Sequence, residues 1–194
     1  MSRLKFKEME RVYGFDEVAL VPGNVTINPD QTNIDLSLGS YTFSIPILAS
    51  AMDAIVDPAF AIKFNQLGGL AVLNLEGIQT RYENPDEVLN QITQAPETEV
   101  TSLLQKIYSE PIKEKLIGKH IGAIKRAGGI CAVSITPANT KRLAPIAKDA
   151  GMDVLVVQST VTTARHISKS YRGLIQHELL DLEPLPVIVG NCCS

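Results

Sequence analysis

The polar side chains best placed for chemistry in this sequence stand where apolar, strand-like segments end. Ser50 lies at the end of one such segment, Gln158, Ser159 and Thr160 lie at the end of another, and Asn191 ends a third. Hydroxyl and amide groups can donate and accept hydrogen bonds without carrying a charge, so the chemistry that these residues could offer is hydrogen bonding to a polar ligand.

The cysteines are weaker candidates for chemistry. Cys131 lies within an apolar strand-like segment and resembles a small buried hydrophobic residue. Cys192 and Cys193 follow Asn191 directly, with no surrounding glycine-serine loop and no partner base in sequence, so we interpret them as structural or terminal thiols. Three cysteines without metal-site or disulfide spacing indicate a reducing cytosol.

The charged and histidine residues point to no metal site and no nucleic-acid partner. His120, His166 and His177 lack metal-site spacing, and we expect the last two on solvent faces of helices. The formal net charge of −3 gives no electrostatic footprint for nucleic acid or a membrane surface. We interpret one basic stretch as a solvated helix face. Its members are Lys113, Lys115, Lys119, Lys125 and Arg126.

The bulk composition predicts one ordinary domain with a real core. The chain has 194 residues, of which 45% are hydrophobic and 20% charged. Residues 1–9 are charged rather than apolar, which argues against a signal peptide. No segment approaches the about 18 consecutive apolar residues of a membrane span, so we expect a soluble, cytoplasmic protein. A GxGxxG turn and a P-loop are also absent from the sequence, which argues against a Rossmann fold.

Short apolar runs alternate with helical stretches in a βαβα order. Consecutive rather than alternating apolar positions are typical of parallel strands covered on both faces. The expected strands are residues 45–52, 70–75, 129–136, 154–160 and 186–191. Five such units favour an α/β fold, an incomplete (β/α)8 TIM barrel, since a complete one takes about 250 residues. We expect an unpaired edge on the first and fifth strands, and therefore poor solubility.

Local signals position the helices between these strands. Asp57 and Pro58 supply an N-cap and a first-turn proline, and glycines 68 and 69 end that helix. Asn84, Pro85 and Glu87 predict a second start with a capping box. Further helices are expected at 101–127 with a break near Pro111, from 137 to 151 with a kink or late start at Pro145, and at 162–182 with an interruption near Gly173.

Two segments resemble the IMP dehydrogenase and GMP reductase family. Residues 13–22, Tyr-Gly-Phe-Asp-Glu-Val-Ala-Leu-Val-Pro, are similar to the family's N-terminal strand Phe-Asp-Asp-Val-Leu-Leu-Val-Pro. Residues 46–54, Pro-Ile-Leu-Ala-Ser-Ala-Met-Asp-Ala, are similar to Pro-Ile-Val-Ser-Ala-Ala-Met-Asp-Thr. Weaker similarity continues to residue 194. The family usually inserts regulatory CBS modules at a place that only residues 78–127 occupy here, so the chain resembles the branch without these modules. Residues 1–194 resemble the N-terminal part of a single barrel domain of that branch.

The resemblance implies roles for the strand-end residues. Ser50 and Met52 match nucleotide contacts, with Met52 lying against the purine; the alternative is that Met52 fills a gap in the core and backbone satisfies Ser50. Asn191 matches an asparagine that helps place the nicotinamide half of the cofactor. Gln158 stands where most family dehydrogenases keep an aspartate, and residues 159 and 160 stand where they keep two serines, so the cofactor contact differs here.

The resemblance also implies an activity. Intact family members convert IMP, NAD and water to XMP and NADH in guanine nucleotide biosynthesis, with a monovalent cation as a possible further cofactor, and they are homo-oligomers. Their catalytic cysteine lies in a Gly-Ser-Ile-Cys-Thr loop that would follow position 194, so we assign no catalytic residue. Should the reading frame end at that position, we expect the purified chain to make no NADH from IMP. GMP reductases have a sequence similar to Ala-Asn-Met-Asp at the position where this chain has Ser-Ala-Met-Asp, residues 50–53. The alternatives are an inactive nucleotide-binding or interaction fragment and a flavin-dependent barrel.

Overall fold

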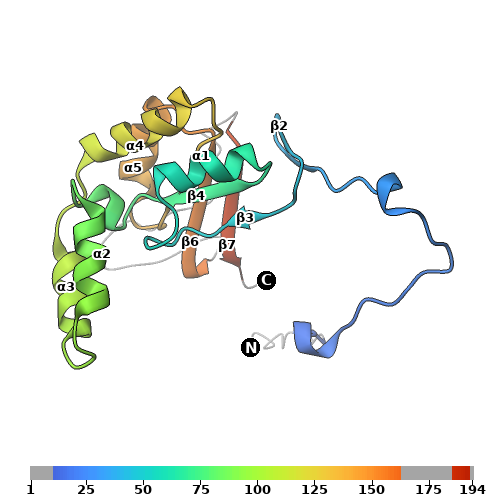
Figure 1. The fold of residues 1–194 in the computed structure, drawn as a ribbon, viewed down its shortest axis with the longest axis horizontal. Helices are drawn as coiled ribbons and strands as arrows, with labels where there is room; N and C mark the ends of the chain where they lie inside the picture. Colours follow the sequence, from blue (N-terminus) through green and yellow to red (C-terminus); the bar gives the residue numbers. More distant parts are fainter. Residues whose placement is uncertain (1–10, 163–184, 193–194) are drawn as a thin grey trace, which may run out of the picture. The chain divides into compact units, whose positions relative to one another are not determined.

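The structure is a computed structural model that describes residues 11–162 and 185–192 (Figure 1). The chain divides into two compact units, Met1–Asn33 and Ile34–Ser194. The described part of the first unit contains two short 3-10 helices, η1 (Phe15–Glu17) and η2 (Pro29–Gln31). Residues 13–22, which resemble the family's N-terminal strand, contain the turn η1 instead. In this turn the Gly14 amide donates to the Glu17 carboxylate over 2.9 Å.

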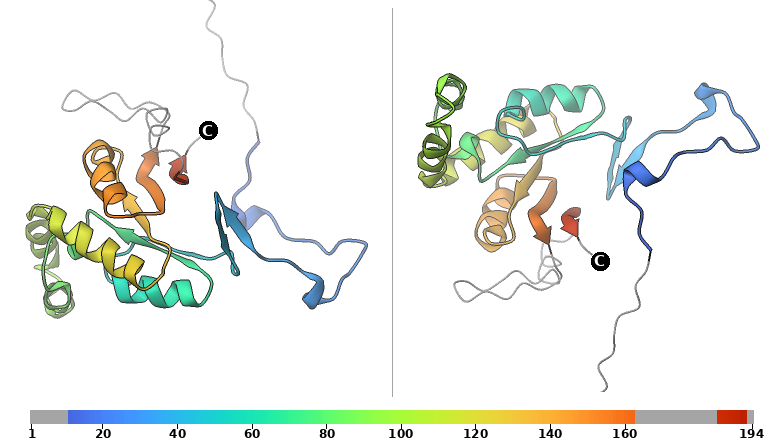
Figure 2. Two further views of the ribbon diagram at one scale, coloured as in Figure 1. Left: turned by 90° about the horizontal axis from the view of Figure 1, so that it is seen from above. Right: turned by 90° about the horizontal axis from the view of Figure 1, so that it is seen from below.

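The second unit is built on five parallel strands that follow one another in chain order across the sheet. They are β3 (Leu48–Ala49), β4 (Leu70–Asn74), β5 (Ala132–Ile135), β6 (Val154–Thr162) and β7 (Val187–Cys192). The sheet curls into a half-barrel, which confirms the predicted incomplete (β/α)8 architecture (Figure 2). In the described part of the chain, β3 and β7 form its two edges, as expected.

The first strand is shorter than the sequence predicted. β3 covers two residues instead of 45–52. The chain leaves the sheet after Ala49 because the amides of Ile55 and Val56 both donate to the Met52 carbonyl, over 3.0 and 2.8 Å. Residues 50–56 therefore form a turn at the end of the strand rather than its continuation.

The helices largely follow the local signals. They are α1 (Pro58–Gln66), η3 (Ile78–Thr80), α2 (Pro85–Gln94), α3 (Val100–Ser109), α4 (Glu114–Arg126) and α5 (Thr140–Asp149). The predicted N-cap is confirmed, since the Asp57 carboxylate accepts the Phe60 amide over 2.6 Å. The predicted capping box of α2 is wrong, because Asn84 makes no side-chain cap bond. α5 runs through Pro145 from a start at Thr140, and residues 163–184 of the last predicted helix lie outside the described residues.

The main core lies between the outer face of the sheet and three helices, α1, α4 and α5 (Figures 1 and 2). Leu73, Val133 and Leu155 point outward from neighbouring strands and are fully buried. The facing helices contribute apolar residues at helical spacing, such as Ile117 and Ile121 of α4. The alternate positions of the same strands, such as Val72 and Ala132, are buried on the inner face, so apolar positions run consecutively along each strand, as the sequence predicted.

A hairpin that the sequence did not predict covers the amino ends of the strands. It joins β1 (Leu36–Leu38) to β2 (Tyr41–Phe43) in antiparallel register. Phe43 is buried against the inner face of the sheet, in a cluster with Leu70, Val72, Ala132 and Val154. These residues lie in the first half of their strands, so the hairpin packs at the amino end of the half-barrel and leaves the carboxyl end as the rim.

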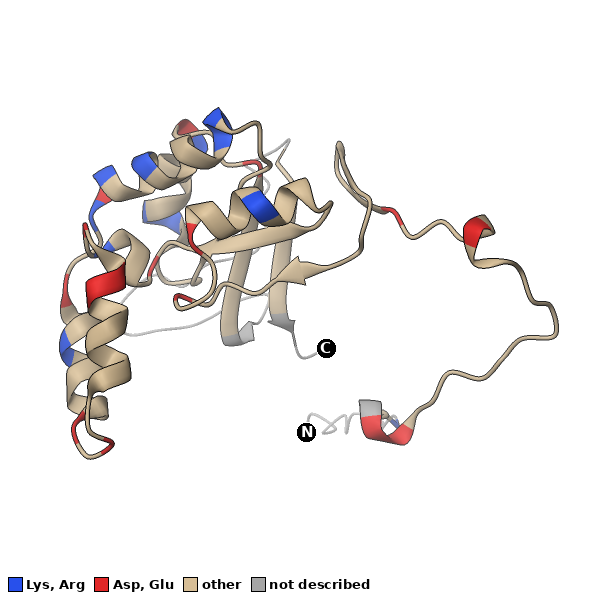
Figure 3. Ribbon diagram, viewed as in Figure 1, with Lys and Arg blue, Asp and Glu red and all other residues tan. Residues whose placement is uncertain are grey.

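The basic stretch of the sequence lies along α4 (Figure 3). Lys115 and Lys119 form ion pairs with Glu83, and both lysine side chains are mostly exposed. α4 turns its apolar residues inward, so Lys115, Lys119 and Arg126 lie on a solvated helix face as predicted, whereas Lys125 is half-buried and donates to Asp153. None of the helices in the described part of the chain combines the length and apolar character that crossing a bilayer requires.

Candidate nucleotide site at the carboxyl ends of the strands

The predicted site residues all lie toward the carboxyl ends of strands in one sheet. Ser50 and Met52 follow β3 directly, whereas Gln158 lies in β6 and Asn191 in β7. In the β6 and β7 register Gln158 faces Gly190, which brings it next to the residue before Asn191. The structure therefore forms two groups at one rim, one on β3 and one on β6 and β7, with β4 and β5 between them.

Ser50 and Met52 lie on the turn that ends β3, and both are exposed. Met52 is 49% exposed, so the interpretation that it fills a gap in the core is wrong. The turn is closed by backbone bonds, in which the Met52 amide donates to the Ser50 carbonyl over 2.8 Å and the Met52 carbonyl accepts two amides. Val56 at the end of the turn is buried in the main core and anchors it. Met52 is thus an exposed apolar side chain on an ordered backbone.

Asp53, the residue after Met52, is the centre of a polar network that the sequence analysis missed. Its Oδ1 accepts from Asn74 Nδ2 over 3.0 Å, and its Oδ2 accepts from the Ile78 amide over 3.1 Å. The Tyr108 hydroxyl donates to the same Oδ2 over 2.6 Å. Burial, followed by this hydrogen bond, raises the pKa of Tyr108 above its ordinary value, which keeps the phenol protonated as a donor.

A second carboxylate extends this network along the rim to β5. Asn74 Oδ1 accepts the Glu76 amide over 2.9 Å, and the Glu76 carboxylate accepts both the amide and the hydroxyl of Thr136, over 3.2 and 3.0 Å. Asn74 ends β4, and Thr136 follows β5. The only sequence signal for this network was the same one that marked Ser50, namely polar residues directly after apolar strands.

The rim near β6 and β7 is more open. Gln158 is exposed and Ser159 is half-buried. A Cβ built on Gly190, the residue opposite Gln158, would meet no heavy atom of the described residues within 4 Å. Thr160 and Asn191 take part in strands, and their side chains lie outside the described part of the structure. This part of the rim therefore offers neutral hydrogen-bonding groups from Gln158 and Ser159.

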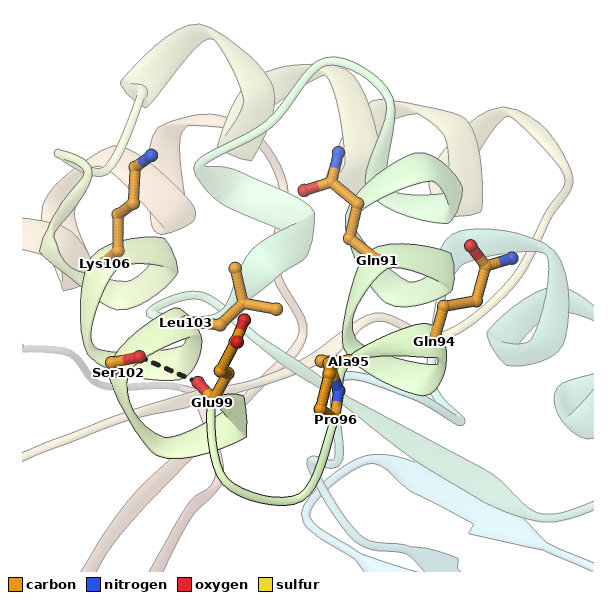
Figure 4. Close-up of a pocket in the computed structure, with 8 residues that line it drawn as sticks. All are labelled: Gln91, Gln94, Ala95, Pro96, Glu99, Ser102, Leu103 and Lys106. Carbon is orange, nitrogen blue, oxygen red and sulfur yellow. Dashed lines mark hydrogen bonds between the residues drawn. The ribbon is translucent and has the colours of Figure 1, made fainter.

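A separate hollow lies on the helical hairpin formed by α2 and α3 (Figure 4). Its lining comes from α2, α3 and the loop between them, and no strand end contributes to it. Within this groove the Ser102 hydroxyl donates to the Glu99 carbonyl over 2.8 Å. The groove is therefore distinct from the rim. Its lining residues are Gln91, Gln94, Ala95, Pro96, Glu99, Ser102, Leu103 and Lys106.

The histidines and cysteines are not part of the rim wherever the structure describes their side chains. His120 is buried in α4, with Nε2 2.8 Å from the Gln79 carbonyl, and burial lowers its pKa. Cys131 is buried, as predicted. Cys192 lies in β7, and Cys193 falls outside the described residues together with both remaining histidines. Among the described residues, no cluster of three histidine, cysteine or acidic residues could hold a metal ion.

The chain resembles several proteins, some of them over nearly its full length. An uncharacterized oxidoreductase of Mycolicibacterium smegmatis is 33% identical over 186 residues, which cover 93% of this chain and 50% of the relative. One of Mycobacterium bovis is 32% identical over 187 residues, with the same coverage of both chains. An inosine-5'-monophosphate dehydrogenase of Methanocaldococcus jannaschii is 36% identical over 70 residues, or 36% of this chain and 14% of the relative. The chain thus spans about half the length of these two oxidoreductases.

The fold has a close counterpart in a crystal structure. An IMP dehydrogenase/GMP reductase-like protein of Corynebacterium glutamicum superposes with a TM-score of 0.85 and 28% sequence identity, over 95% of this chain and 50% of that one. The sequence profile described as the IMP dehydrogenase / GMP reductase domain matches residues 12–194. With this match and with the half-barrel and its rim in place, the chain belongs to the IMP dehydrogenase / GMP reductase family.

Proposed function

We propose that the protein is an oxidoreductase of purine nucleotides that binds IMP at the β3 side of the rim and NAD at the β6 and β7 side. The observation that carries this proposal is the turn after β3, where the exposed Met52 and Ser50 stand on a backbone fixed by hydrogen bonds. Relatives named oxidoreductases and IMP dehydrogenases support it.

The chemistry of the turn suits a purine nucleotide. The thioether of Met52 is polarizable and adapts to a flat aromatic ring, and its exposure leaves that surface available. The Ser50 hydroxyl can donate to or accept from a polar group of the same ligand. Because Asp53 already accepts three hydrogen bonds from the protein, its carboxylate is held at the base of the turn rather than offered to the ligand.

NAD, when bound, supplies the acceptor for a hydride from the substrate. Gln158, Ser159, Thr160 and Asn191 are the residues that we propose hold it. A neutral glutamine can bind a ribose hydroxyl or a carboxamide, but without the charge of an aspartate. We therefore expect Gln158→Asp to change cofactor affinity without changing the affinity for IMP.

Met52→Ala is the direct test of the IMP site. We expect the dissociation constant for IMP, measured by calorimetric titration, to rise about 10- to 150-fold, because the variant removes roughly 1.5 to 3 kcal/mol of apolar contact with the ring. Leu67→Ala is the matched control, since Leu67 is also exposed, at 60%, but lies between α1 and the amino end of β4, away from the carboxyl ends of the strands. If the Met52→Ala variant bound IMP as tightly as the original protein, the proposed contact between Met52 and IMP would be excluded.

The reaction itself is tested with the protein expressed from its complete gene. We expect NADH to form when IMP and NAD are supplied together, and not when either is omitted. Consumption of NADPH in the presence of GMP, without NADH formation from IMP, would assign the protein to the reductase side of the family instead.

A further inference from the structure

We propose that Tyr108 is a positioning residue, which acts through Asp53 to set the turn that presents Ser50 and Met52. This inference rests on the proposed nucleotide site and extends it to α3, a helix that contributes no residue to that site. Tyr108 lies 55 residues after Asp53 in the chain, and their side chains meet over 2.6 Å.

The Asp53 carboxylate collects donors from three different elements. Asn74 donates from the end of β4 and the Ile78 amide from η3, both adjoining the sheet. Tyr108 donates from the last turn of α3. Since Asp53 follows Met52 directly and the Met52 carbonyl closes the turn, the three bonds to this carboxylate restrain the backbone next to Met52.

Close packing holds the Asp53 carboxylate in one place. A Cβ built on Gly77 would lie 1.7 Å from Asp53 Oδ1, so the carboxylate fills the space that any other residue at position 77 would need. It cannot move toward Gly77, and its other sides are occupied by the three donors. Loss of one donor therefore changes the position or the mobility of the Asp53 carboxylate, because the space toward Gly77 is already filled.

Tyr108 belongs to a helical hairpin with its own small core. Ile78, Val88 and Ile107 form this core between η3, α2 and α3, and the Tyr82 hydroxyl donates to the Ile107 carbonyl over 3.0 Å. The Arg81 guanidinium lies 6.0 Å from the centre of the Tyr108 ring. Because α3 is tied to α2 and η3 as one body, the position of the hairpin is transmitted to Asp53 by the Tyr108 hydroxyl.

The test compares Tyr108→Phe with Tyr82→Phe in the full 194-residue chain. Each variant removes one hydroxyl from the same hairpin, and only the first removes a donor to Asp53. Hydrogen exchange at the amides of Ile55 and Val56 reports the turn directly, because both donate to the Met52 carbonyl. Calorimetric titration with IMP as the probe reports the consequence for binding.

We expect Tyr108→Phe to speed exchange at these two amides, and to raise the dissociation constant for IMP, each by about five- to tenfold, since the lost bond is charge-assisted. Tyr82→Phe should change neither, while both variants should lose similar amounts of thermal stability. Gly77→Ala, which displaces Asp53 from the opposite side, should reproduce the effects of Tyr108→Phe.

The two arms separate this inference from the proposed function. If the original chain does not bind IMP, the proposed nucleotide site is wrong. Hydrogen exchange at the amides of Ile55 and Val56 then still shows whether Tyr108 controls the turn. Unchanged exchange in Tyr108→Phe overturns the inference. Faster exchange with an unchanged affinity for IMP also overturns it, because Tyr108 would then stabilise the turn without positioning the site.

Discussion

Asp153→Ala is expected to lower the free energy of unfolding by about 3 kcal/mol, a large share of the roughly 5 to 15 kcal/mol of a typical domain. The Asp153 carboxylate accepts from Lys125 Nζ over 2.6 Å, from the Cys131 amide over 2.7 Å and from the Tyr41 hydroxyl over 2.9 Å. Its side chain is only 12% exposed, so alanine leaves the amide and the hydroxyl without a partner away from water. Lys125 is 36% exposed and can turn to solvent, which keeps the loss below that of a fully buried charge.

Two further variants show whether the loss comes from this cluster. Tyr41→Phe removes one of the three donors and should cost about 1 kcal/mol. Asp149→Ala removes an exposed carboxylate at the end of α5, where a negative charge opposes the helix dipole, so stability should stay equal or rise slightly. Urea unfolding followed by circular dichroism measures all three. An Asp153→Ala variant as stable as Asp149→Ala would contradict the assigned role.

The position of this cluster explains why the loss should be structural. Tyr41 lies in β2 of the hairpin, and Asp153 directly precedes β6, so their bond ties the hairpin to the amino end of the half-barrel. Burial, followed by this bond, raises the pKa of Tyr41, which keeps its hydroxyl a donor. The two ends of the sheet are thus organised by different carboxylates, Asp53 at the rim and Asp153 beneath the strands. Residues at the amino end of a barrel serve stability, and those at the carboxyl end serve function.

The sequence could identify the long buried strands but not these two roles. Asp53 and Asp153 both follow a methionine, yet Met52 is 49% exposed at the rim while Met152 is buried in the main core. The dipeptide alone does not reveal this difference, because the end of a strand at which it lies depends on where that strand begins. The resemblance to the family marked Ser50 and Met52, and the fold then placed them at the rim.

The missed elements share a physical cause, since their stability comes from contacts distant in sequence. β1 and β2 have three residues each, too few for a pattern, and Phe43 is buried only because the sheet lies against it. The bond between Asp53 and Tyr108 likewise depends on how α3 packs. By contrast, the start of α1 was predictable because its Asp57 cap acts within three residues.

Cys131 in the native protein should react with iodoacetamide about a thousandfold more slowly than the same thiol in the unfolded chain, because the thiolate is the reactive species. Burial, together with the nearby charge of Asp153, raises the pKa of Cys131 from 9.0 to about 12, although Lys125 partly opposes this. This rise reduces the thiolate fraction near neutral pH by about 10³. The side chain is also only 1% exposed, so shielding from the reagent slows the reaction of the native protein further.

The measurement requires a chain in which Cys131 is the one remaining thiol. Cys192→Ser combined with Cys193→Ser provides this, and mass spectrometry after timed alkylation gives the rate with and without urea. A native rate within tenfold of the unfolded rate would contradict a buried, protonated thiol.

Adding Asp153→Ala links this prediction to the first one. If reaction proceeds through global opening, a loss of about 3 kcal/mol raises the open population, and with it the native rate, by about 100-fold. A rise in rate without the matching loss in urea stability would instead show that Asp153 acts on Cys131 locally, through its charge and its bond to the Cys131 amide.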